Sequence, residues 1–239
     1  MAKKTVKSTK TTSRASPSSD ESPTDRKARA KKILAALRKA YPDATCALNH
    51  TSALELLVAT ILSAQCTDER VNIVTADLFK RYKTPADYAG ESPAAFQQQI
   101  RSTGFFRQKT KSILAACAAI ATDHSGRVPQ TMDELTRLPG VARKTANVML
   151  GTWFDKNEGI CVDTHVGRLA RRMGLTWTSR NDKDAVKIES DLMALIPRRS
   201  WTFFSHAMIW HGRRICTARK PACDQCVVAR WCPSAFGPM

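Results

Sequence analysis

The chain has 239 residues, of which 43% are hydrophobic, so it is long and apolar enough to bury the core of one large domain or two small ones. This composition excludes a chain that is disordered throughout. The formal net charge of +17 and the sequence pI of 9.9 favour a polyanionic partner, with nucleic acid first and an anionic membrane surface second.

Residues 1–24 are rich in Lys, Ser, Thr and Pro and offer little to bury, so the sequence predicts a disordered basic tail. Beyond it, apolar residues recur at helical spacing between short polar breaks. Helices are predicted at about 25–40, 52–63, 67–79, 93–100, 107–121, 132–138, 143–150, 183–195 and 201–213, with one more beginning near 164. Because no stretch shows strand alternation, the predicted fold class is all-α.

A helix–hairpin–helix is predicted around Pro139 and Gly140, because proline ends the first helix and glycine accepts a positive φ. The free N–H groups at the start of the second helix favour an anion, and a DNA phosphate suits that position. Such contacts bind DNA without reading its sequence. The DNA contacts expected from this segment are Leu138, Gly140, Val141, Arg143 and Thr145.

Lys144 lies in the first turn of the second hairpin helix, where a cation opposes the helix dipole. This placement leaves two interpretations open, an amine nucleophile or a lysine that only adds affinity for phosphate. Asp163 follows nineteen residues later and is placed to cap the helix that begins near Thr164. Without Lys144, capping alone explains this aspartate.

Four cysteines form a C-x6-C-x2-C-x5-C pattern near the end of the sequence: Cys216, Cys223, Cys226 and Cys232. Thiols at this density indicate a metal site. Zinc normally takes two C-x2-C pairs, whereas an iron–sulfur cluster accepts looser spacing, so the pattern favours a cluster over zinc. The basic loop between the first two cysteines offers Arg219 and Lys220 as further phosphate contacts. The remaining cysteines are expected to be small buried apolar residues, at Cys46, Cys66, Cys117 and Cys161.

The hairpin with Lys144, the segment around Asp163 and the cysteine pattern together resemble endonuclease III, a family of bifunctional DNA glycosylase/AP lyases of the helix–hairpin–helix superfamily. The resemblance covers about residues 30–236, and Leu62–Asp68 is similar to the loop of that family that enters the damage site. One departure is Ala142, which replaces the second glycine of the family's hairpin. Alanine is tolerated there if its φ is negative.

The resemblance implies two helical domains on either side of a DNA cleft. The six-helix barrel domain with the hairpin corresponds to residues 46–157. The iron–sulfur domain corresponds to residues 25–45 and 158–239 and holds a [4Fe–4S] cluster on the four cysteines named above.

By the same resemblance, Lys144 attacks the sugar C1′ of a nucleotide flipped out of the duplex, and Asp163 assists. Gln65 fills the gap that the nucleotide leaves, and β-elimination then cuts the strand 3′ to the lesion. Phe105 and Phe106 are candidates for the lining of the base pocket. A flipped base costs a few kcal/mol of stacking and pairing, and the enzyme must compensate for this cost.

The expected partner is double-stranded DNA with damaged bases, chiefly oxidised or ring-saturated pyrimidines, or with abasic sites. A cytoplasmic, nucleoid-associated monomer is expected, with a nuclear or mitochondrial location as alternatives. No membrane contact is expected, because no apolar run approaches ~20 residues, and no secretory signal pattern is present. One alternative is an adenine-mismatch glycosylase of the same superfamily, which typically lacks the lysine and carries a further C-terminal domain. Another is a non-catalytic helix–hairpin–helix protein with a zinc knuckle.

Overall fold

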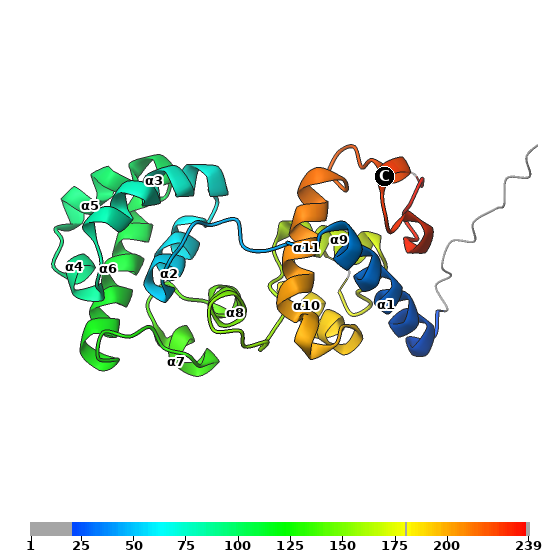
Figure 1. Ribbon diagram of the computed structural model, residues 1–239, viewed down its shortest axis with the longest axis horizontal. Coiled ribbons are helices and arrows are strands. Elements are labelled where there is room, and N and C mark those ends of the chain that lie inside the picture. Colours follow the sequence, from blue (N-terminus) through cyan, green and yellow to red (C-terminus); the bar gives the residue numbers. More distant parts are fainter. Residues whose placement is uncertain (1–20, 180, 238–239) are drawn as a thin grey trace, which may run out of the picture.

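The computed structural model describes residues 21–179 and 181–237. Within these ranges the chain is helical and contains no strand, so the predicted all-α class is confirmed. Figure 1 shows two lobes joined by two irregular segments. No helix in the described ranges is long and apolar enough to cross a membrane. Residues 1–20 of the predicted disordered tail lie outside the described residues.

The lobe that we call the barrel lobe is built on residues 46–154 and has its own hydrophobic core. Its helices are α2 (Ala53–Leu62), α3 (Asp68–Arg81), α4 (Pro85–Ala89), α5 (Pro93–Ile100), α6 (Phe106–Asp123), α7 (Met132–Arg137) and α8 (Arg143–Thr152), with the 3-10 helix η1 (Arg101–Thr103) before α6. α2 is central, because its Leu56, Leu57 and Leu62 side chains are fully buried. The hairpin is the α7–α8 unit, at the side that faces the other lobe (Figure 1).

The other lobe, the cysteine lobe, combines residues 21–44 with residues 160–237 around a second core. It contains α1 (Pro23–Ala40), α9 (Thr164–Arg172), α10 (Ala185–Leu195), α11 (Trp201–Arg214) and the 3-10 helices η2 (Arg198–Ser200), η3 (Cys223–Gln225) and η4 (Ala229–Trp231). α1 packs against α10 and α11, so the chain leaves this lobe after its first helix and returns after α8.

Most helices begin at a residue whose side chain accepts a hydrogen bond from the first turn, as at Ser52 and Thr67. The short helix α4 was not predicted from the sequence. Five residues are too few to establish helical periodicity, although Thr84 and Asp87 form a capping box in which each side chain bonds the other's backbone.

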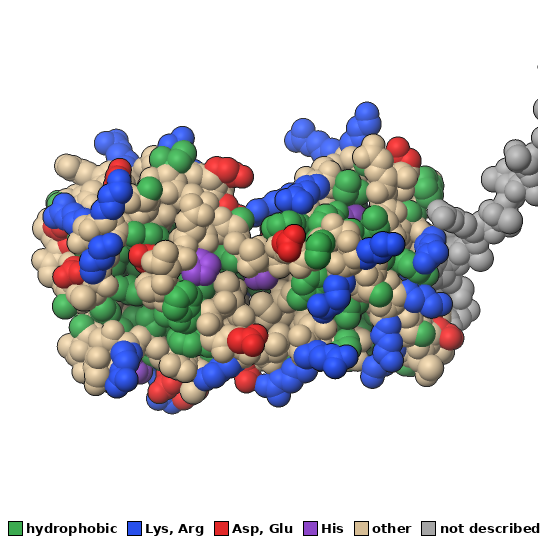
Figure 2. Space-filling model, viewed as in Figure 1, with side chains coloured by type: hydrophobic (Ala, Val, Ile, Leu, Met, Phe, Trp, Pro, Cys, Tyr) green, Lys and Arg blue, Asp and Glu red, His purple; other side chains and the backbone are tan. Residues whose placement is uncertain are grey.

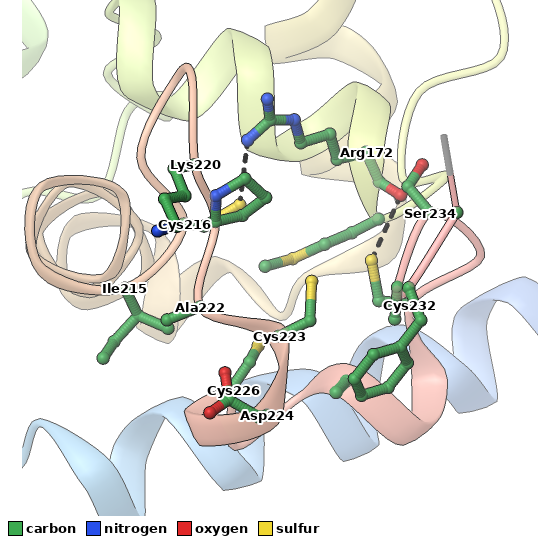
Figure 3. A pocket seen from close by; sticks show the side chains of 16 residues that line it. Arg172, Ile215, Cys216, Lys220, Ala222, Cys223, Asp224, Cys226, Cys232 and Ser234 are labelled. Carbon is green, nitrogen blue, oxygen red and sulfur yellow. Dashed lines mark hydrogen bonds between the residues drawn. The ribbon is translucent and has the colours of Figure 1, made fainter. Parts of the chain in front are cut away.

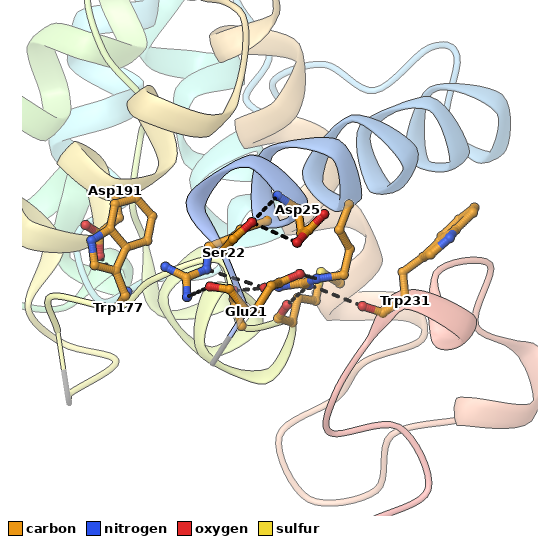
Figure 4. A network of polar contacts seen from close by, with 10 residues as sticks. Glu21, Ser22, Asp25, Trp177, Asp191 and Trp231 are labelled. Carbon is orange, nitrogen blue, oxygen red and sulfur yellow. Dashed lines mark hydrogen bonds and ion pairs between the residues drawn. The ribbon is translucent and has the colours of Figure 1, made fainter. Parts of the chain in front are cut away.

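The folded part begins earlier than predicted, because residues 21–24 lead into and begin α1 rather than form part of the tail. Ser22 caps α1, and both Glu21 carboxylate oxygens accept hydrogen bonds of 2.7 Å from Arg29 (Figure 4). Arg29 is 9% exposed and also donates to the carbonyl oxygens of Gly174 and Trp231. The start of α1 is thereby tied to the turn after α9 and to the residue just before Cys232.

Candidate functional site

A cavity of about 240 Å³ lies between the two lobes. Gln65 from the barrel lobe, Lys144 from the hairpin and Asp163 from the cysteine lobe all line it. The opposite side comes from α11, through His206, Ile209, Trp210 and Arg213. The structure therefore brings together the predicted catalytic pair and the predicted gap-filling glutamine, which are distant in the sequence.

The Lys144 amine has no bonding partner among the described residues. Its side chain is exposed in the first turn of α8 and makes no hydrogen bond or ion pair with any described residue. The residue before the helix, Ala142, has φ −90° and ψ 168°, so its φ is negative as the sequence analysis required. Because alanine has no acceptor in its side chain, no side chain caps the N–H groups of the first turn of α8. These groups remain available to an anion.

Asp163 caps α9, since its Oδ1 accepts a 2.8 Å hydrogen bond from the Val166 N–H. The described residues supply no other hydrogen bond to this carboxylate, so its second oxygen is free to act in the cavity. Burial raises the pKa of the neighbouring Cys161 thiol to about 12, with the Lys144 charge lowering it and the Asp163 charge raising it. Both charged groups therefore lie close to the same thiol.

The hairpin uses its side chains mainly for its own packing. Leu138 and Val141 are 3% and 5% exposed, so only their backbone groups remain for contact with DNA. Gly140 has φ +77°, and a Cβ built on it would lie 2.4 Å from Cβ of Ser112 on α6. Thr145 lines the cavity beside Lys144. The hairpin thus rests directly on α6.

Replacing Gly140 with alanine is expected to destabilise the protein and weaken its binding to DNA. The positive φ costs an alanine ~1–2 kcal/mol, and the clash with Ser112 adds ~1–3 kcal/mol. Gly126→Ala is the matched control, because Gly126 has φ +73° and open space around it. Denaturant unfolding and fluorescence anisotropy with a duplex check both effects. Equal losses for the two variants would mean that contact with Ser112 does not matter.

Arg143, a predicted DNA contact, forms an ion pair within the protein and remains half exposed. Its Nε and Nη2 donate to the Glu189 carboxylate at 3.0 and 3.2 Å, and Asn147 donates to the same carboxylate at 2.8 Å. Glu189 lies on α10 and is 6% exposed. The Arg143 guanidinium therefore holds the hairpin helix to the cysteine lobe, and this pairing was not predicted from the sequence.

A second cavity, of about 260 Å³, lies on the other side of the Gln65 loop and is also lined by Phe105, Lys109 and Gly140. Phe105 is 65% exposed and has φ +47°, and Gln65 has φ +52°. Neither phenylalanine of the predicted pair lines the cavity with Lys144. Phe105 lines the second cavity instead, and Phe106 packs against the core of the barrel lobe.

One contact between the lobes and one between α11 and the segment that links the lobes border the cavity with Lys144. Arg213 Nη1 donates to Asp68 Oδ2 at 2.7 Å, and the Trp210 indole N–H donates to the Thr45 carbonyl at 3.2 Å. These two contacts were not predicted from the sequence. Only the location of Asp68, at the end of the loop that contains Gln65, indicated that one of these residues lies near the site.

The four clustered cysteines surround a separate cavity of about 540 Å³ in the cysteine lobe (Figure 3). Among the described residues, no three Cys, His, Asp or Glu side chains converge closely enough for a single metal ion. Four thiols around a space of this size fit a cluster of several atoms better than one zinc ion. Burial raises the pKa of Cys226, and neighbouring Cys216 and Cys223 raise it further, whereas binding a metal requires this thiol to lose its proton.

Neighbouring groups hold the loop that carries Arg219 and Lys220. Arg172 donates to the carbonyl oxygens of Thr217 and Ala218, each at 2.7 Å, and to Cys216 Sγ at 3.3 Å. Arg219 and Lys220 are exposed and do not line the cavity with Lys144. They form a separate basic element beside the cysteines.

Figure 2 shows more Lys and Arg than Asp and Glu side chains on the visible face of the molecule.

The four cysteines outside the C-terminal cluster differ in burial. Cys117 and Cys161 are buried as predicted, but Cys46 and Cys66 are partly exposed. The prediction was wrong for these two because they lie in the irregular segments next to the interlobe cavity rather than inside a core.

Residues 58–198 match the family described as HhH-GPD superfamily base excision DNA repair protein, and residues 216–232 match the iron–sulfur binding domain of endonuclease III. Endonuclease III of Synechocystis sp. is 52% identical over 210 residues, which cover 88% of this chain and 94% of that protein. Endonuclease III of Escherichia coli is 37% identical over 206 residues, or 86% and 95% of the two chains.

Among solved structures, a non-covalent endonuclease III–DNA complex superposes with a TM-score of 0.82 at 41% identity, covering 87% of this chain and 96% of that one. A trapped endonuclease III–DNA covalent intermediate gives a TM-score of 0.82 at 40% identity. A thermostable thymine-DNA glycosylase superposes with a TM-score of 0.77 at 21% identity, which is a likeness of fold alone.

Proposed function

Because the chain belongs to the endonuclease III family of base excision DNA-repair proteins, we propose that its interlobe cavity is the active site of a DNA glycosylase and AP lyase that acts on damaged pyrimidines and abasic sites in duplex DNA. The observation that carries this proposal is the free Lys144 amine beside the Asp163 carboxylate in one cavity. We further assign the barrel lobe to the family's six-helix barrel domain and the cysteine lobe to its cluster domain, acting as a monomer.

DNA docking follows from the hairpin and the charge. The uncapped N–H groups of α8 and the Gly140 backbone bind a phosphate, while exposed Arg219 and Lys220 contact the backbone elsewhere. The damaged nucleotide swings into the interlobe cavity, which requires its base to leave the stack. Gln65 and Phe105, exposed on either side of the second cavity, occupy the space that it leaves.

Lys144 and Asp163 divide the chemistry between them. The Lys144 amine attacks C1′, the bond from C1′ to the base breaks, and the base leaves with its electron pair and takes up a proton from water. Asp163 takes the proton that the lysine nitrogen loses and stabilises positive charge on the sugar. The sugar ring then opens to an imine between Lys144 and C1′. Loss of a C2′ proton and of the 3′ phosphate completes β-elimination.

The chain binds a [4Fe–4S] cluster through Cys216, Cys223, Cys226 and Cys232. When bound, the cluster supplies a cross-link between segments that have little regular structure of their own. The cysteines thereby hold the loop with Arg219 and Lys220 in place for contact with DNA.

A panel of duplexes tests the substrate class. Each carries one lesion: a ring-saturated thymine, an oxidised cytosine, an abasic site, or adenine opposite oxidised guanine. We expect release of the damaged pyrimidine and incision at the first three, and no release of adenine. Adenine release without incision would instead support the adenine-mismatch alternative, and binding without reaction would support a non-catalytic protein.

Asp163→Asn is expected to reduce base release by ~10²–10⁴-fold while leaving the stability of the protein nearly unchanged. Asparagine caps a helix about as well as aspartate but accepts no proton, so the substitution removes the chemical role and keeps the cap. Asp163→Ala also loses the cap, which costs ~1 kcal/mol of unfolding free energy. Single-turnover kinetics and denaturant unfolding separate the two roles. Near-normal kinetics for Asp163→Asn would leave the carboxylate as a cap only.

A further inference from the structure

Lys109 is a buried lysine outside the catalytic cavity. It lies in the first turn of α6, is 4% exposed, and its Nζ donates at 2.7 Å to each of the carbonyl oxygens of Leu62 and Thr103. Burial lowers the pKa of its ammonium group, and the nearby Cys66 opposes that shift. A buried ammonium is unfavourable unless its N–H groups find acceptors, and an apolar chain of similar length would fill the same space without that cost.

The two acceptors lie just before two exposed residues with positive φ, Gln65 and Phe105. Leu62 is the last residue of α2 and leads into Gln65, and Thr103 is the last residue of η1 and leads into Phe105. Gln65 has φ +52° and Phe105 has φ +47°. A residue other than glycine in this region carries ~1–2 kcal/mol of strain and keeps its conformation only when its surroundings hold it.

These elements converge on the second cavity. Gln65, Phe105 and Lys109 line it together with Gly140 of the hairpin. Ser112 lies one turn further along α6 than Lys109 and is the residue that a Cβ on Gly140 would strike. One face of α6 therefore supports the Gln65 loop, the Phe105 turn and the hairpin at once.

We propose that Lys109 is a positioning residue that fixes the spacing of Gln65 and Phe105, so that both side chains enter the duplex as one unit when the nucleotide is extruded. Its ammonium joins two backbone segments that have no helix in common. Misplacement of inserted groups by about 1 Å can cost ~100-fold in rate even far from the chemistry. The proposal rests on the proposed function and adds a residue that acts on extrusion rather than on bond cleavage.

The test compares Lys109→Met with Lys111→Met, which removes an exposed lysine from the same helix. Single-turnover borohydride trapping is measured on an abasic site in an intact duplex and on one in an unpaired single strand. On the duplex, Lys109→Met is expected to trap ~10–100-fold more slowly than wild type. On the single strand, where no stack must open, the two rates should match. Lys111→Met should resemble wild type on both substrates.

A fluorescent base next to the abasic site follows unstacking directly, and its signal should rise more slowly with Lys109→Met. In a background of Gln65→Ala and Phe105→Ala, the same substitution should cause little further loss, because it acts through those two residues. Parallel losses on both substrates would mean a general structural role and would overturn the proposal. If Lys109→Met does not fold, Lys109→Gln, which keeps a donor for one carbonyl, is measured with the same criteria.

The outcomes also separate this inference from the proposed function. A wild-type protein that binds both substrates but traps on neither contradicts the lyase assignment. A wild-type protein that traps on both, with Lys109→Met equal to Lys111→Met, contradicts only the role of Lys109.

Discussion

Replacing Lys144 with alanine eliminates the covalent adduct that borohydride forms between the protein and a duplex with one abasic site. Reduction fixes the imine between a lysine nitrogen and the sugar, and Lys144 is the lysine that lines the interlobe cavity. The rate of strand cleavage should fall by about 10³-fold or more, as in other enzymes that lose a nucleophile. Gel electrophoresis after trapping measures the adduct, and anisotropy measures DNA binding.

Lys144→Arg separates the two interpretations that the sequence left open. Arginine keeps the positive charge and binds phosphate at least as well as lysine, but it remains protonated and forms no imine. The variant should therefore bind DNA like wild type and trap no adduct. Retained cleavage in Lys144→Arg would reduce Lys144 to a phosphate contact. Stability should not fall in either variant, because alanine removes a cation that opposes the helix dipole and arginine keeps the charge that lysine has.

The features that the sequence predicted correctly depend on local signals. The all-α class follows from apolar periodicity, and the hairpin turn follows from Pro139 and Gly140. Gly140 has the expected positive φ in the structure. The family assignment followed from the coincidence of this hairpin, the Asp163 segment and the spacing of four cysteines. Each signal lies within a short stretch, so no knowledge of tertiary packing was needed.

Contacts between the lobes were beyond such reasoning. Arg213 and Asp68 are 145 residues apart, and their pairing depends on how α11 packs against the start of α3. The Arg143 side chain was expected on DNA, but its position is set by Glu189 on a helix that is 46 residues away. An exposed Phe105 or a buried Lys109 is also invisible in composition, because its role depends on which loops lie beside it.

The two lobes use their Lys and Arg side chains in different ways. In the barrel lobe, the hairpin presents backbone N–H groups and Lys144, while Lys109 is hidden and serves the arrangement of loops. In the cysteine lobe, Arg29 and Arg172 are used internally on backbone carbonyl oxygens. Some of the 38 Lys and Arg side chains are therefore bound within the fold and are not free to bind phosphate.

Replacing Cys226 with serine is expected to remove the cluster and release the last segment of the cysteine lobe. Residues 215–237 contain only the 3-10 helices η3 and η4, so few backbone hydrogen bonds hold them without the four thiolates. Iron content and the visible absorption of the protein should be lost, and this segment should become sensitive to limited proteolysis. The barrel lobe should stay folded because its core is separate. Cys117→Ala, which removes a buried thiol from that core, should keep its iron.

The same variant tests how the cluster contributes to binding. Affinity falls as the salt concentration rises, and each phosphate contact makes the plot of log affinity against log salt concentration steeper by nearly one unit. Loss of the Arg219 and Lys220 contacts should therefore make this plot shallower by about 2 units. The double variant Arg219→Ala and Lys220→Ala keeps all four cysteines and should show the same change in slope with normal iron content. If Cys226→Ser loses much more affinity than the double variant, the cluster also holds the two lobes in the arrangement that binds DNA. If it loses no affinity, the basic loop does not contact DNA.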